Sequence, residues 1–572
     1  MDSKATDRER VPEPRWGGPS GWLLPMAGVL AVVGLALPPA TTVEALRPGG
    51  ADAGLGLVAG AWALKGLLLL HAAVLAWLAR KTVPAGGVAL VRLPEPEANA
   101  GPGFLPAAMG LVVVAIFVRI PGLDAGLWYD EIDTLVSYVR LPLGEILTTF
   151  DSKNQHMLFS VLARGAVVLF GESAWTLRAP AMLFGVASVG ALLWFGRLVA
   201  GRWEALAAAG IMAVSYHHVW FSQNARGYTG LLLWTLLGTG LLLRMLADRR
   251  PRSWGRPLAY GGVMALAMFT HATAVFVIGA HALLVAALAF GRRADPRSPT
   301  VALPLLGLVL SGTLSLLLYA VVFPQFVDTM LAPTMAGAQT EWKSPVWLVV
   351  ESLRGLQRGL PGGWVAVLGG AVIGGAGFLG YWRQSKVATA AMLLPLLLTA
   401  TAIVALQHNL WPRFFFFGAG FALLIVVRGV FVASRLALPR SAAAPVALGV
   451  AAALALGNGA ILPRAWGPKQ DYQGALELVE GSRQPGDAVV MLDMTRLPYA
   501  EYLHTDWVAA EALPELRAIE ERSSRTWIVY TFPVRLSAVH PEIWTRLQSD
   551  YRTVATLPAT VGSGEIVVMV KG

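Results

Sequence analysis

Long apolar runs recur through most of this chain and constrain its fold more than any other feature. Lipid offers no partners for backbone N–H and C=O groups, so every run that crosses a bilayer must be a helix. Only 14% of the residues are charged, against about 25% in soluble domains, and the mean hydropathy is +0.58. We therefore expect an all-α polytopic membrane protein. Its apolar segments lie near residues 21–38, 55–78, 104–120, 156–171, 179–197, 204–220, 226–246, 257–270, 272–290, 302–323, 363–381, 387–406, 414–433 and 441–462.

Basic loops set the expected orientation. Lys and Arg concentrate in alternate loops, which the positive-inside rule places in the cytoplasm. Segment 156–171 would break this alternation if it crossed, and it contains Arg164, whose insertion at the bilayer centre costs roughly 2.5–3.5 kcal/mol. We therefore expect it to insert only partly or not at all, which leaves about 13 spans, a cytoplasmic tail at 1–20 and an outer C-terminus. The basic loops are 1–20, 79–103, 197–203, 247–256, 291–300, 382–386 and 434–440.

Composition excludes several kinds of protein. Cysteine is absent, so the chain has no disulfide, thiolate metal site or cysteine nucleophile. The net charge of +10 comes mostly from loops, and no Lys/Arg-rich run carries interleaved aromatic residues, so we expect no nucleic acid as a partner. No A-x-A-like cleavage site cleanly follows the run from Gly21 to Pro38, which favours a retained first span over a removed signal peptide.

The composition changes after Pro463, where soluble patterning begins. We expect residues 464–572 to form a small extracytoplasmic α/β domain. It would follow a transmembrane domain at 21–463, whose outer catalytic loop is 121–178. Gly562-Ser563-Gly564 is more typical of a hairpin turn than of a phosphate-binding loop. The expected strands are 488–492, 526–531 and 565–570, with a turn at 484–487 and a helix at 497–504.

Two adjacent carboxylates, Asp130 and Glu131, lie where the chain leaves the span that ends at Ile120. With the expected topology, polar side chains from four other segments reach the same side of the membrane. These side chains belong to His156, Gln223, Asn224, Arg226, Tyr228, His271 and Arg413. By contrast, His217 and His218 lie within a span, where we expect them to pack.

This collection of residue types has a chemical interpretation. A carboxylate that takes a proton from an alcohol makes the alcohol a nucleophile. Arginines can hold a phosphate through paired hydrogen bonds and stabilise it as a leaving group. Histidine can orient the site or bind a divalent metal. A lipid-borne phosphosugar would keep its tail in the bilayer and its sugar outside, so the predicted reaction is glycosyl transfer from a lipid phosphate to an acceptor hydroxyl.

The order of several short motifs resembles the bacterial family-39 glycosyltransferases of the GT-C class, which include the protein O-mannosyltransferases and the lipid A aminoarabinose transferases. The resemblance covers about residues 104–300 and continues weakly to Trp411-Pro412-Arg413. Spans 21–78 and the C-terminal domain lie outside it. The motifs are Trp128-Tyr129-Asp130-Glu131, Asn154-Gln155-His156-Met157-Leu158, Gly171-Glu172-Ser173, Leu177-Arg178-Ala179-Pro180, Gly196-Arg197, Phe221-Ser222-Gln223-Asn224-Ala225-Arg226-Gly227-Tyr228 and Thr270-His271.

The resemblance implies an inverting transferase that uses a polyprenyl-phosphate sugar on the outer face. The family's general base corresponds to Asp130, and we expect Glu131 to take part in catalysis as well. Contacts to the substrate or its phosphate are expected from His156, Gln223, Arg226, Tyr228, His271 and Arg413.

A divalent metal ion is the one cofactor that the resemblance suggests, with Glu131, Asn224 and His271 as candidate ligands. Relatives often carry Glu or Asp at the position of Asn224, and a Pro-Pro pair at the position of Met157-Leu158. An asparagine is a poor anionic ligand, so the sequence leaves metal dependence open.

Two other functions remain open at this stage. A transporter or flippase for a lipid-linked glycan would use the same charged residues without breaking a bond, although the spans hold few charges apart from Lys65. A non-catalytic envelope assembly protein would bind through the C-terminal domain. The expected partners are a polyprenyl-phosphate sugar carrying a hexose or pentose, a glycan, lipid or protein acceptor, and the lipid bilayer of a bacterial inner membrane.

Overall fold

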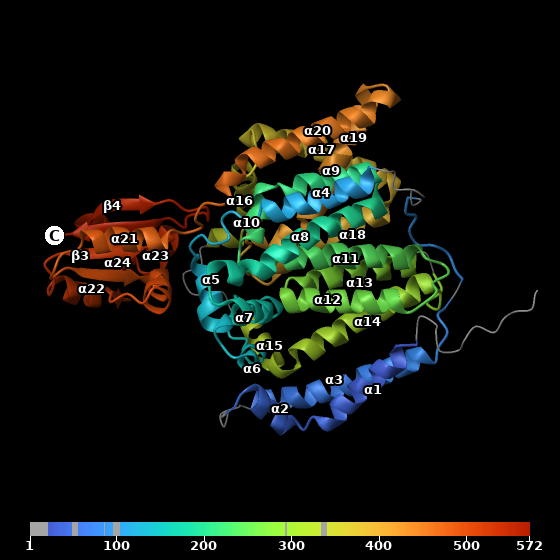
Figure 1. Ribbon diagram of the computed structural model, residues 1–572, viewed down its shortest axis with the longest axis horizontal. Helices are drawn as coiled ribbons and strands as arrows, with labels where there is room; N and C mark the ends of the chain where they lie inside the picture. The colour runs from blue at the N-terminus through green and yellow to red at the C-terminus, as the bar shows by residue number, and fades with distance from the viewer. Residues whose placement is uncertain (1–20, 49–54, 85, 95–102, 292–293, 333–339) are drawn as a thin grey trace, which may run out of the picture.

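A helical bundle makes up most of the molecule, and a small sheet domain projects from one end of it (Figure 1). The computed structural model describes residues 21–48, 55–84, 86–94, 103–291, 294–332 and 340–572. The predicted tail at 1–20 therefore lies outside the described residues. The expectation of an all-α polytopic bundle with a small C-terminal α/β domain is confirmed.

The helices of the bundle run through the chain from residue 23 to residue 461. They are α1 Leu23–Ala36, α2 Pro39–Leu46, α3 Leu55–Ala79, α4 Phe104–Phe117, α5 Tyr129–Thr134, α6 Leu143–Thr148, α7 Met157–Phe170, α8 Ala174–Val199, α9 Arg202–Ala213, α10 Tyr216–Ser222, α11 Tyr228–Ala247, α12 Gly255–Thr270, α13 Ala274–Gly291, α14 Pro299–Tyr319, α15 Phe323–Leu331, α16 Pro345–Arg358, α17 Gly363–Gln384, α18 Lys386–Ala405, α19 Ala419–Ala437 and α20 Arg440–Ile461.

The structure does not confirm the expected count of 13 spans. Among the described residues, nine helices are long and apolar enough to cross a membrane, and the pair α1 and α2, bent by 90°, would make a tenth. Helices α4, α9 and α12 have 14, 12 and 16 residues. At 1.5 Å per residue each reaches at most about 24 Å, short of a hydrocarbon core of about 30 Å.

Helix α7 corresponds to the apolar segment 156–171 and has 14 residues, so it is too short to cross a bilayer alone. It lies beside α5 and α6 at the end of the bundle nearest the sheet domain (Figure 1). The Arg164 side chain donates from Nη1 to the carbonyl of Val139 at 3.4 Å. The arginine therefore has a protein partner at this end of the bundle.

The C-terminal domain is a five-stranded sheet with helices on both faces. The strand order is β2-β1-β3-β5-β4; β1 is parallel to β2 and β3, and β5 is antiparallel to β3 and β4. The three expected strands and the hairpin turn between β4 and β5 are present, whereas 497–502 forms a π-helical turn. The elements are α21 Tyr472–Ser482, β1 Ala488–Leu492, β2 Val508–Ala510, α22 Leu513–Glu520, β3 Thr526–Tyr530, α23 Pro533–Val539, α24 Pro541–Asp550, β4 Arg552–Leu557 and β5 Ile566–Lys571.

One hydrophobic core crosses from the bundle into the sheet domain. Ile132 and Phe159 of the bundle are fully buried in the same cluster as Tyr499 and Val529 of the sheet domain. The other face of the sheet has its own core under α22, α23 and α24. The change in composition at residue 463 therefore separates two kinds of sequence, while apolar packing holds the sheet domain firmly against the outer loop.

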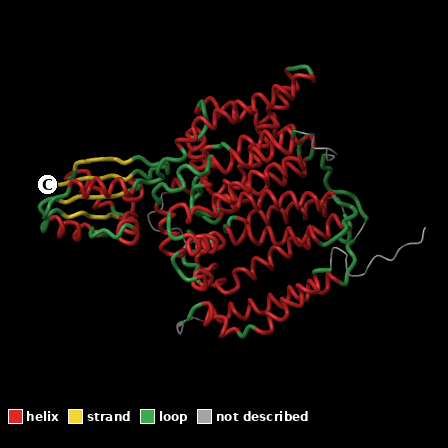
Figure 2. The backbone as a smooth tube through the Cα atoms, viewed as in Figure 1, coloured by secondary structure: helices red, strands yellow, loops and turns green. Residues whose placement is uncertain are grey.

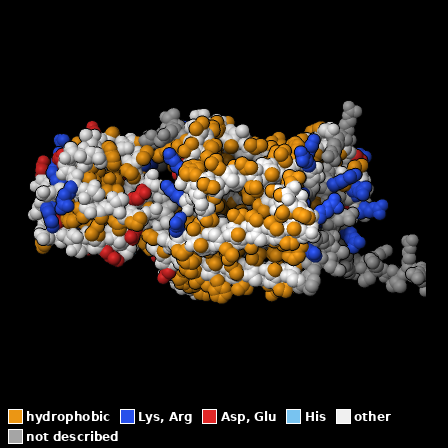
Figure 3. Space-filling view, turned by 90° about the horizontal axis from the view of Figure 1, so that it is seen from above, with side chains coloured by type: hydrophobic (Ala, Val, Ile, Leu, Met, Phe, Trp, Pro, Cys, Tyr) orange, Lys and Arg blue, Asp and Glu red, His pale blue; other side chains and the backbone are white. Residues whose placement is uncertain are grey.

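Charge divides the two ends of the bundle. Hydrophobic side chains cover its flank, and Lys and Arg gather at the end remote from the sheet domain (Figure 3). The loop between α11 and α12, at 248–254, belongs to this basic end (Figure 1). The loop 121–178 lies at the opposite end, beside the sheet domain.

Close backbone contact between α17 and α19 generates a prediction. A Cβ on Gly377 would overlap the carbonyl oxygen of Ile425, whereas a Cβ on Gly375 meets nothing within 4 Å. Gly377→Val should force the helices apart and lower the free energy of unfolding by about 1–3 kcal/mol. Thermal unfolding in detergent measures this, with Gly375→Val as the control on the same helix. Equal stability of the two variants would contradict the packing.

Candidate functional site

The site is built around α5, a short helix whose first turn holds Asp130 and Glu131. The carboxylate of Glu131 turns back and accepts the backbone N–H of Trp128 at 3.3 Å, which caps the helix. Two acidic residues in a first turn also favour the helix dipole. Successive helical side chains point about 100° apart, so the two carboxylates face different surroundings.

Glu131 faces inward and is fully buried against Arg178. The guanidinium donates from Nε to Oε1 at 2.8 Å and from Nη2 to Oε2 at 2.6 Å, and the backbone N–H of Ala225 donates to Oε1 at 2.7 Å. Burial alone would raise the pKa of Glu131, but Arg178 outweighs it and lowers this pKa. The structure therefore places Glu131 in an internal ion pair, where it positions α5, rather than at the open side of the site.

The sequence shows Arg178 only as a member of a motif and predicts no role for it. In the structure it joins three parts of the site. Besides Glu131, it donates to four carbonyl groups of the loop that precedes α5. Those carbonyls belong to Gly122, Leu123, Ala125 and Gly126, at 3.3, 2.8, 2.6 and 3.1 Å. The arginine thus fixes where α5 begins.

Asp130 faces the other way, toward two arginines. Its Oδ2 lies 3.3 Å from Nη1 of Arg413 and 3.8 Å from Nη1 of Arg226. Buried nitrogen atoms of both guanidinium groups lack an acceptor: Nε and Nη1 of Arg226, and Nε of Arg413. Two cations and one carboxylate leave a net positive charge with unfilled hydrogen-bond donors, which is the chemistry of an anion-binding site.

Two buried histidines lie beside these groups. Backbone N–H groups of Gly227 and Thr273 donate to Nδ1 of His156 and of His271, at 2.8 and 3.2 Å. In His271, with Nδ1 accepting, the neutral tautomer carries its proton on Nε2. In His156 a donor approaches each ring nitrogen, because Nε2 lies 3.2 Å from Nη2 of Arg226 and an arginine can only donate. Burial, reinforced by Arg226, holds the pKa of His156 well below its usual range and lowers the pKa of His271 to about 3. Both rings therefore stay neutral, and His271 presents an Nε2–H.

Tyr228 forms an aromatic wall beside these groups. It begins α11, and its ring centroid lies 5.6 Å from that of His156 and 5.2 Å from that of His271. The guanidinium of Arg226 lies 5.9 Å from the same ring. The structure thus brings five of the expected residues around Asp130.

Gln223 and Asn224 make internal contacts instead. The amide of Gln223 donates to the carbonyls of Arg119, at 2.9 Å, and Pro121. The Oδ1 of Asn224 accepts the indole N–H of Trp128 at 3.1 Å. These two side chains fix the turn that carries Arg226 against the end of α4 and the start of α5.

The three candidate metal ligands do not form a donor set. Oxygen atoms of Glu131 are paired with Arg178, the oxygen of Asn224 is held by Trp128, and Nδ1 of His271 accepts a backbone N–H. Within the described ranges, no group of three or more His, Asp or Glu side chains has metal-binding geometry. The residues present therefore do not fit a divalent ion at this position.

Two important residues come from the far end of the chain. Gln470 is fully buried; its Oε1 accepts the N–H of Tyr129 at 3.0 Å, and its Nε2 donates to Oγ1 of Thr531 at 2.9 Å. Lys469 is also buried and donates to the carbonyl of Gln223 at 2.5 Å. No spacing or motif in the sequence distinguishes these residues, which reach the site only through the packing of the sheet domain.

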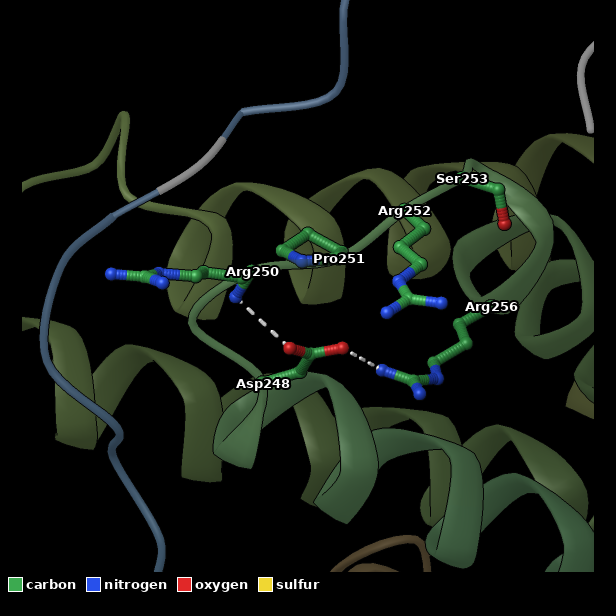
Figure 4. Close-up of a pocket in the computed structure, with 6 residues that line it drawn as sticks. All are labelled: Asp248, Arg250, Pro251, Arg252, Ser253 and Arg256. Atoms are coloured by element: carbon green, nitrogen blue, oxygen red, sulfur yellow. Dashed lines mark hydrogen bonds and ion pairs between the residues drawn. The ribbon is translucent and has the colours of Figure 1, made fainter. Parts of the chain in front are cut away.

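A polar cavity lies at the other end of the bundle. It measures about 320 Å³ and follows the last turn of α11, so the 20-residue helix separates it from Arg226 by about 30 Å (Figure 4). That distance excludes it from the chemistry at Asp130. Its lining residues are Asp248, Arg250, Pro251, Arg252, Ser253 and Arg256.

Comparison with known proteins agrees with the motifs. Residues 155–319 match the model of the family described as dolichyl-phosphate-mannose-protein mannosyltransferase. The structure is similar to ArnT from Cupriavidus metallidurans in the apo state, with 13% identity, 82% of this chain and 98% of that chain covered, and a TM-score of 0.51. It is also similar to the archaeal oligosaccharyltransferase AglB from Archaeoglobus fulgidus in complex with an inhibitory peptide and a dolichol-phosphate.

For AglB the identity is 12%, the coverage 81% of this chain and 74% of that chain, and the TM-score 0.50. Comparison with curated protein sequences gave no match. At such identities the structures show the fold alone, which is the GT-C fold. His156, Arg226 and His271 lie within the matched family region, whereas Asp130 precedes it and Arg413 follows it.

The buried ion pair generates a prediction about stability. Arg178→Met leaves Glu131 buried without its cation and should cost about 3–5 kcal/mol of unfolding free energy. The control is Arg140→Met, which removes an exposed pair with Glu172 at 2.8 Å and should cost about 0–1 kcal/mol. Denaturation of both purified variants tests this. A loss at Arg178 no larger than at Arg140 would contradict the assigned role.

Lys469 generates a prediction about pH. Burial lowers its pKa from 10.5 to about 7 in the folded protein. Between these values the unfolded chain binds a proton that the folded chain releases, so this group's contribution to stability rises with pH above 7 and its cost is complete below 7.

The arginine of a Lys469→Arg variant stays charged across this range. Relative to that variant, the wild type should gain about 3 kcal/mol of stability between pH 6 and pH 9, because two pKa units correspond to about 2.7 kcal/mol. Thermal unfolding at both pH values measures the difference. A constant difference would show that Lys469 does not change protonation.

Proposed function

We propose that this chain, which is related to the GT-C membrane glycosyltransferases, moves a sugar from a polyprenyl-phosphate donor to an acceptor hydroxyl with inversion. The observation that carries the proposal is the carboxylate of Asp130 beside Arg226 and Arg413, whose buried donors lack acceptors. The description of the matching family names dolichyl-phosphate mannose, and the AglB structure is a complex with a dolichol-phosphate.

The donor phosphate would bind between the two guanidinium groups. Arg226 offers Nε and Nη1, and Arg413 offers Nε, without breaking an internal hydrogen bond. The neutral ring of His271 adds an Nε2–H, whereas Nε2 of His156 faces Nη2 of Arg226. Once the phosphate pairs with Arg226 and Arg413, the ion pairs of these arginines with Asp130 weaken, and the Asp130 carboxylate can accept a proton.

In the reaction, the acceptor O–H gives its proton to a carboxylate oxygen of Asp130. The acceptor oxygen forms a bond to the anomeric carbon while the bond from that carbon to the phosphate oxygen breaks. The electron pair leaves with the polyprenyl phosphate, whose growing charge Arg226 and Arg413 stabilise. Attack from the face opposite the leaving group inverts the anomeric configuration.

The division of charge favours an outer active face. The end of the bundle that carries Asp130 also carries the sheet domain, and the arginine-rich loop 248–254 lies at the other end (Figures 1 and 3). By the positive-inside rule, that loop faces the cytoplasm. In a bacterial inner membrane, transfer would therefore occur on the extracytoplasmic side, with the sheet domain outside and the N-terminus inside.

The first test compares Asp130→Asn with wild type in release of polyprenyl phosphate from a labelled polyprenyl-phosphate sugar. Loss of a general base should lower turnover by about 10²- to 10⁴-fold while donor binding is retained. Asp133→Asn is the matched control, because Asp133 lies one turn further along α5 and is held by Ser137 at 2.8 Å and Asn154 at 2.6 Å.

Full turnover by Asp130→Asn would exclude this residue as the base. If neither protein turns over donors carrying hexoses or pentoses, but both bind polyprenyl phosphate, transport of a lipid-linked glycan becomes the better explanation. Release that is lost to the same extent in Asp130→Asn and Asp133→Asn would indicate a general disturbance of α5.

A further inference from the structure

Two residues at one edge of the C-terminal sheet have left-handed backbone conformations. Asp493 directly follows β1 with φ of 49°, and Phe532 lies just beyond β3 with φ of 51°. A residue other than glycine in such a conformation costs about 1–3 kcal/mol and persists where its surroundings impose it, often at functional sites. Because β1 and β3 are parallel neighbours, both residues mark the carboxyl edge, where open α/β sheets bind ligands.

That edge faces the helix that carries Asp130. The strands run along the long axis of the molecule, so their ends, rather than their free edges, point to the bundle (Figure 2). Thr531, immediately after β3, accepts the Gln470 amide at 2.9 Å, and Gln470 accepts the N–H of Tyr129 at 3.0 Å. A single side chain therefore connects the carboxyl edge to the residue before Asp130.

A charged pair lies at the same edge. Arg535, at the start of α23, donates from Nε to Oδ2 of Asp493 at 2.8 Å and from Nη2 to Oδ1 at 3.2 Å. Burial, then Asp133 and Asp130, raise the pKa of Tyr129 to about 12, while Arg535 lowers it and Asp493 raises it. The charges of Asp130 and of the Asp493–Arg535 pair therefore both act on the phenol of Tyr129.

From this placement we propose that the Asp493–Arg535 pair, together with Tyr129, binds the acceptor and directs one of its hydroxyl groups to Asp130. The inference rests on the proposed transferase and extends it by naming the class of acceptor. That acceptor is a carbohydrate. None of the sequence motifs includes Asp493 or Arg535.

The chemistry of the edge favours a carbohydrate over a peptide. Neighbouring sugar hydroxyls donate and accept at once, and the pair presents carboxylate acceptors beside guanidinium donors in one plane. An extended peptide would instead add to a free edge strand. The free edges of this sheet are β2 and β4, whereas the part that approaches α5 is the carboxyl end of β1 and β3.

The sheet domain contains a matched control pair. Arg546 binds Glu520 in the same way, from Nη2 at 2.6 Å and Nε at 3.3 Å. The side chains are 24% and 9% exposed, against 24% and 10% for Arg535 and Asp493. Glu520 also binds Lys571 at the end of β5, which pairs with the first residue of β3, so this pair lies at the opposite edge.

The experiment uses the full chain, purified in detergent, with labelled undecaprenyl-phosphate mannose, glucose and aminoarabinose as parallel donors. Acceptor probes are polysaccharide extracted from the envelope of the producing cells and a mixture of Ser/Thr-containing peptides. Asp493→Asn and Arg535→Gln are compared with Glu520→Gln and Arg546→Gln. Release of undecaprenyl phosphate without acceptor reports on the proposed transferase itself.

We expect label in the polysaccharide. Asp493→Asn and Arg535→Gln should raise the polysaccharide concentration for half-maximal transfer by about 10- to 100-fold, as expected for loss of a charge-assisted hydrogen bond. For Asp493→Asn and Arg535→Gln, the release of undecaprenyl phosphate without acceptor and the thermal unfolding should match those of the wild type. For Glu520→Gln and Arg546→Gln, transfer to the polysaccharide should match that of the wild type.

Three outcomes would overturn the inference and leave the proposed transferase intact. They are label in the peptides alone, release of undecaprenyl phosphate without transfer to polysaccharide, and equal loss of transfer in variants of the Asp493–Arg535 and Glu520–Arg546 pairs. No release from any donor would instead remove the proposed function on which it rests.

Discussion

The buried pair of Glu131 and Arg178 is the interaction on which the rest of the site depends. Burying an ion pair adds little net stability by itself, because desolvation offsets the attraction. Here the guanidinium also satisfies four loop carbonyls, and the carboxylate also accepts two backbone N–H groups. The pair therefore acts on the geometry of the site. The Glu131 carboxylate fixes the position of α5, and this sets the direction in which the neighbouring Asp130 side chain points.

Charge around Asp130 follows the same logic. Backbone N–H groups donate to Nδ1 of His156 and of His271, and burial keeps both rings neutral, so neither ring adds charge. Positive charge then comes from Arg226 and Arg413. The cluster of Asp130, Arg226 and Arg413 carries one more cation than anions, which would suit the anionic head group of the proposed lipid donor.

Periodicity and composition allowed the helices and the fold class to be predicted from the sequence. Contacts between residues far apart in the chain could not be predicted in this way. Apolar runs marked the helices, and the residues around Asp130 came from motif order. Short runs such as 257–270 look like spans although α12 has only 16 residues. The sequence does not distinguish a polar side chain that binds substrate from one that, like Gln223, donates to a nearby carbonyl. Strand β2 has three residues, too few for a pattern. Nothing in sequence marks Gln470, since its partner lies 341 residues away.

That separation means that the site around Asp130 is completed late in synthesis. Asp130, Arg226 and Arg413 have all left the ribosome before Gln470 is made, and at roughly 5–20 residues per second the 341 residues between Tyr129 and Gln470 take roughly 17–70 s. During that interval the helix that carries Asp130 lacks the acceptor that Gln470 supplies and the apolar cover of the sheet domain. A nascent chain that ends before Gln470 therefore lacks part of the site around Asp130, which is complete only after the sheet domain has packed against the bundle.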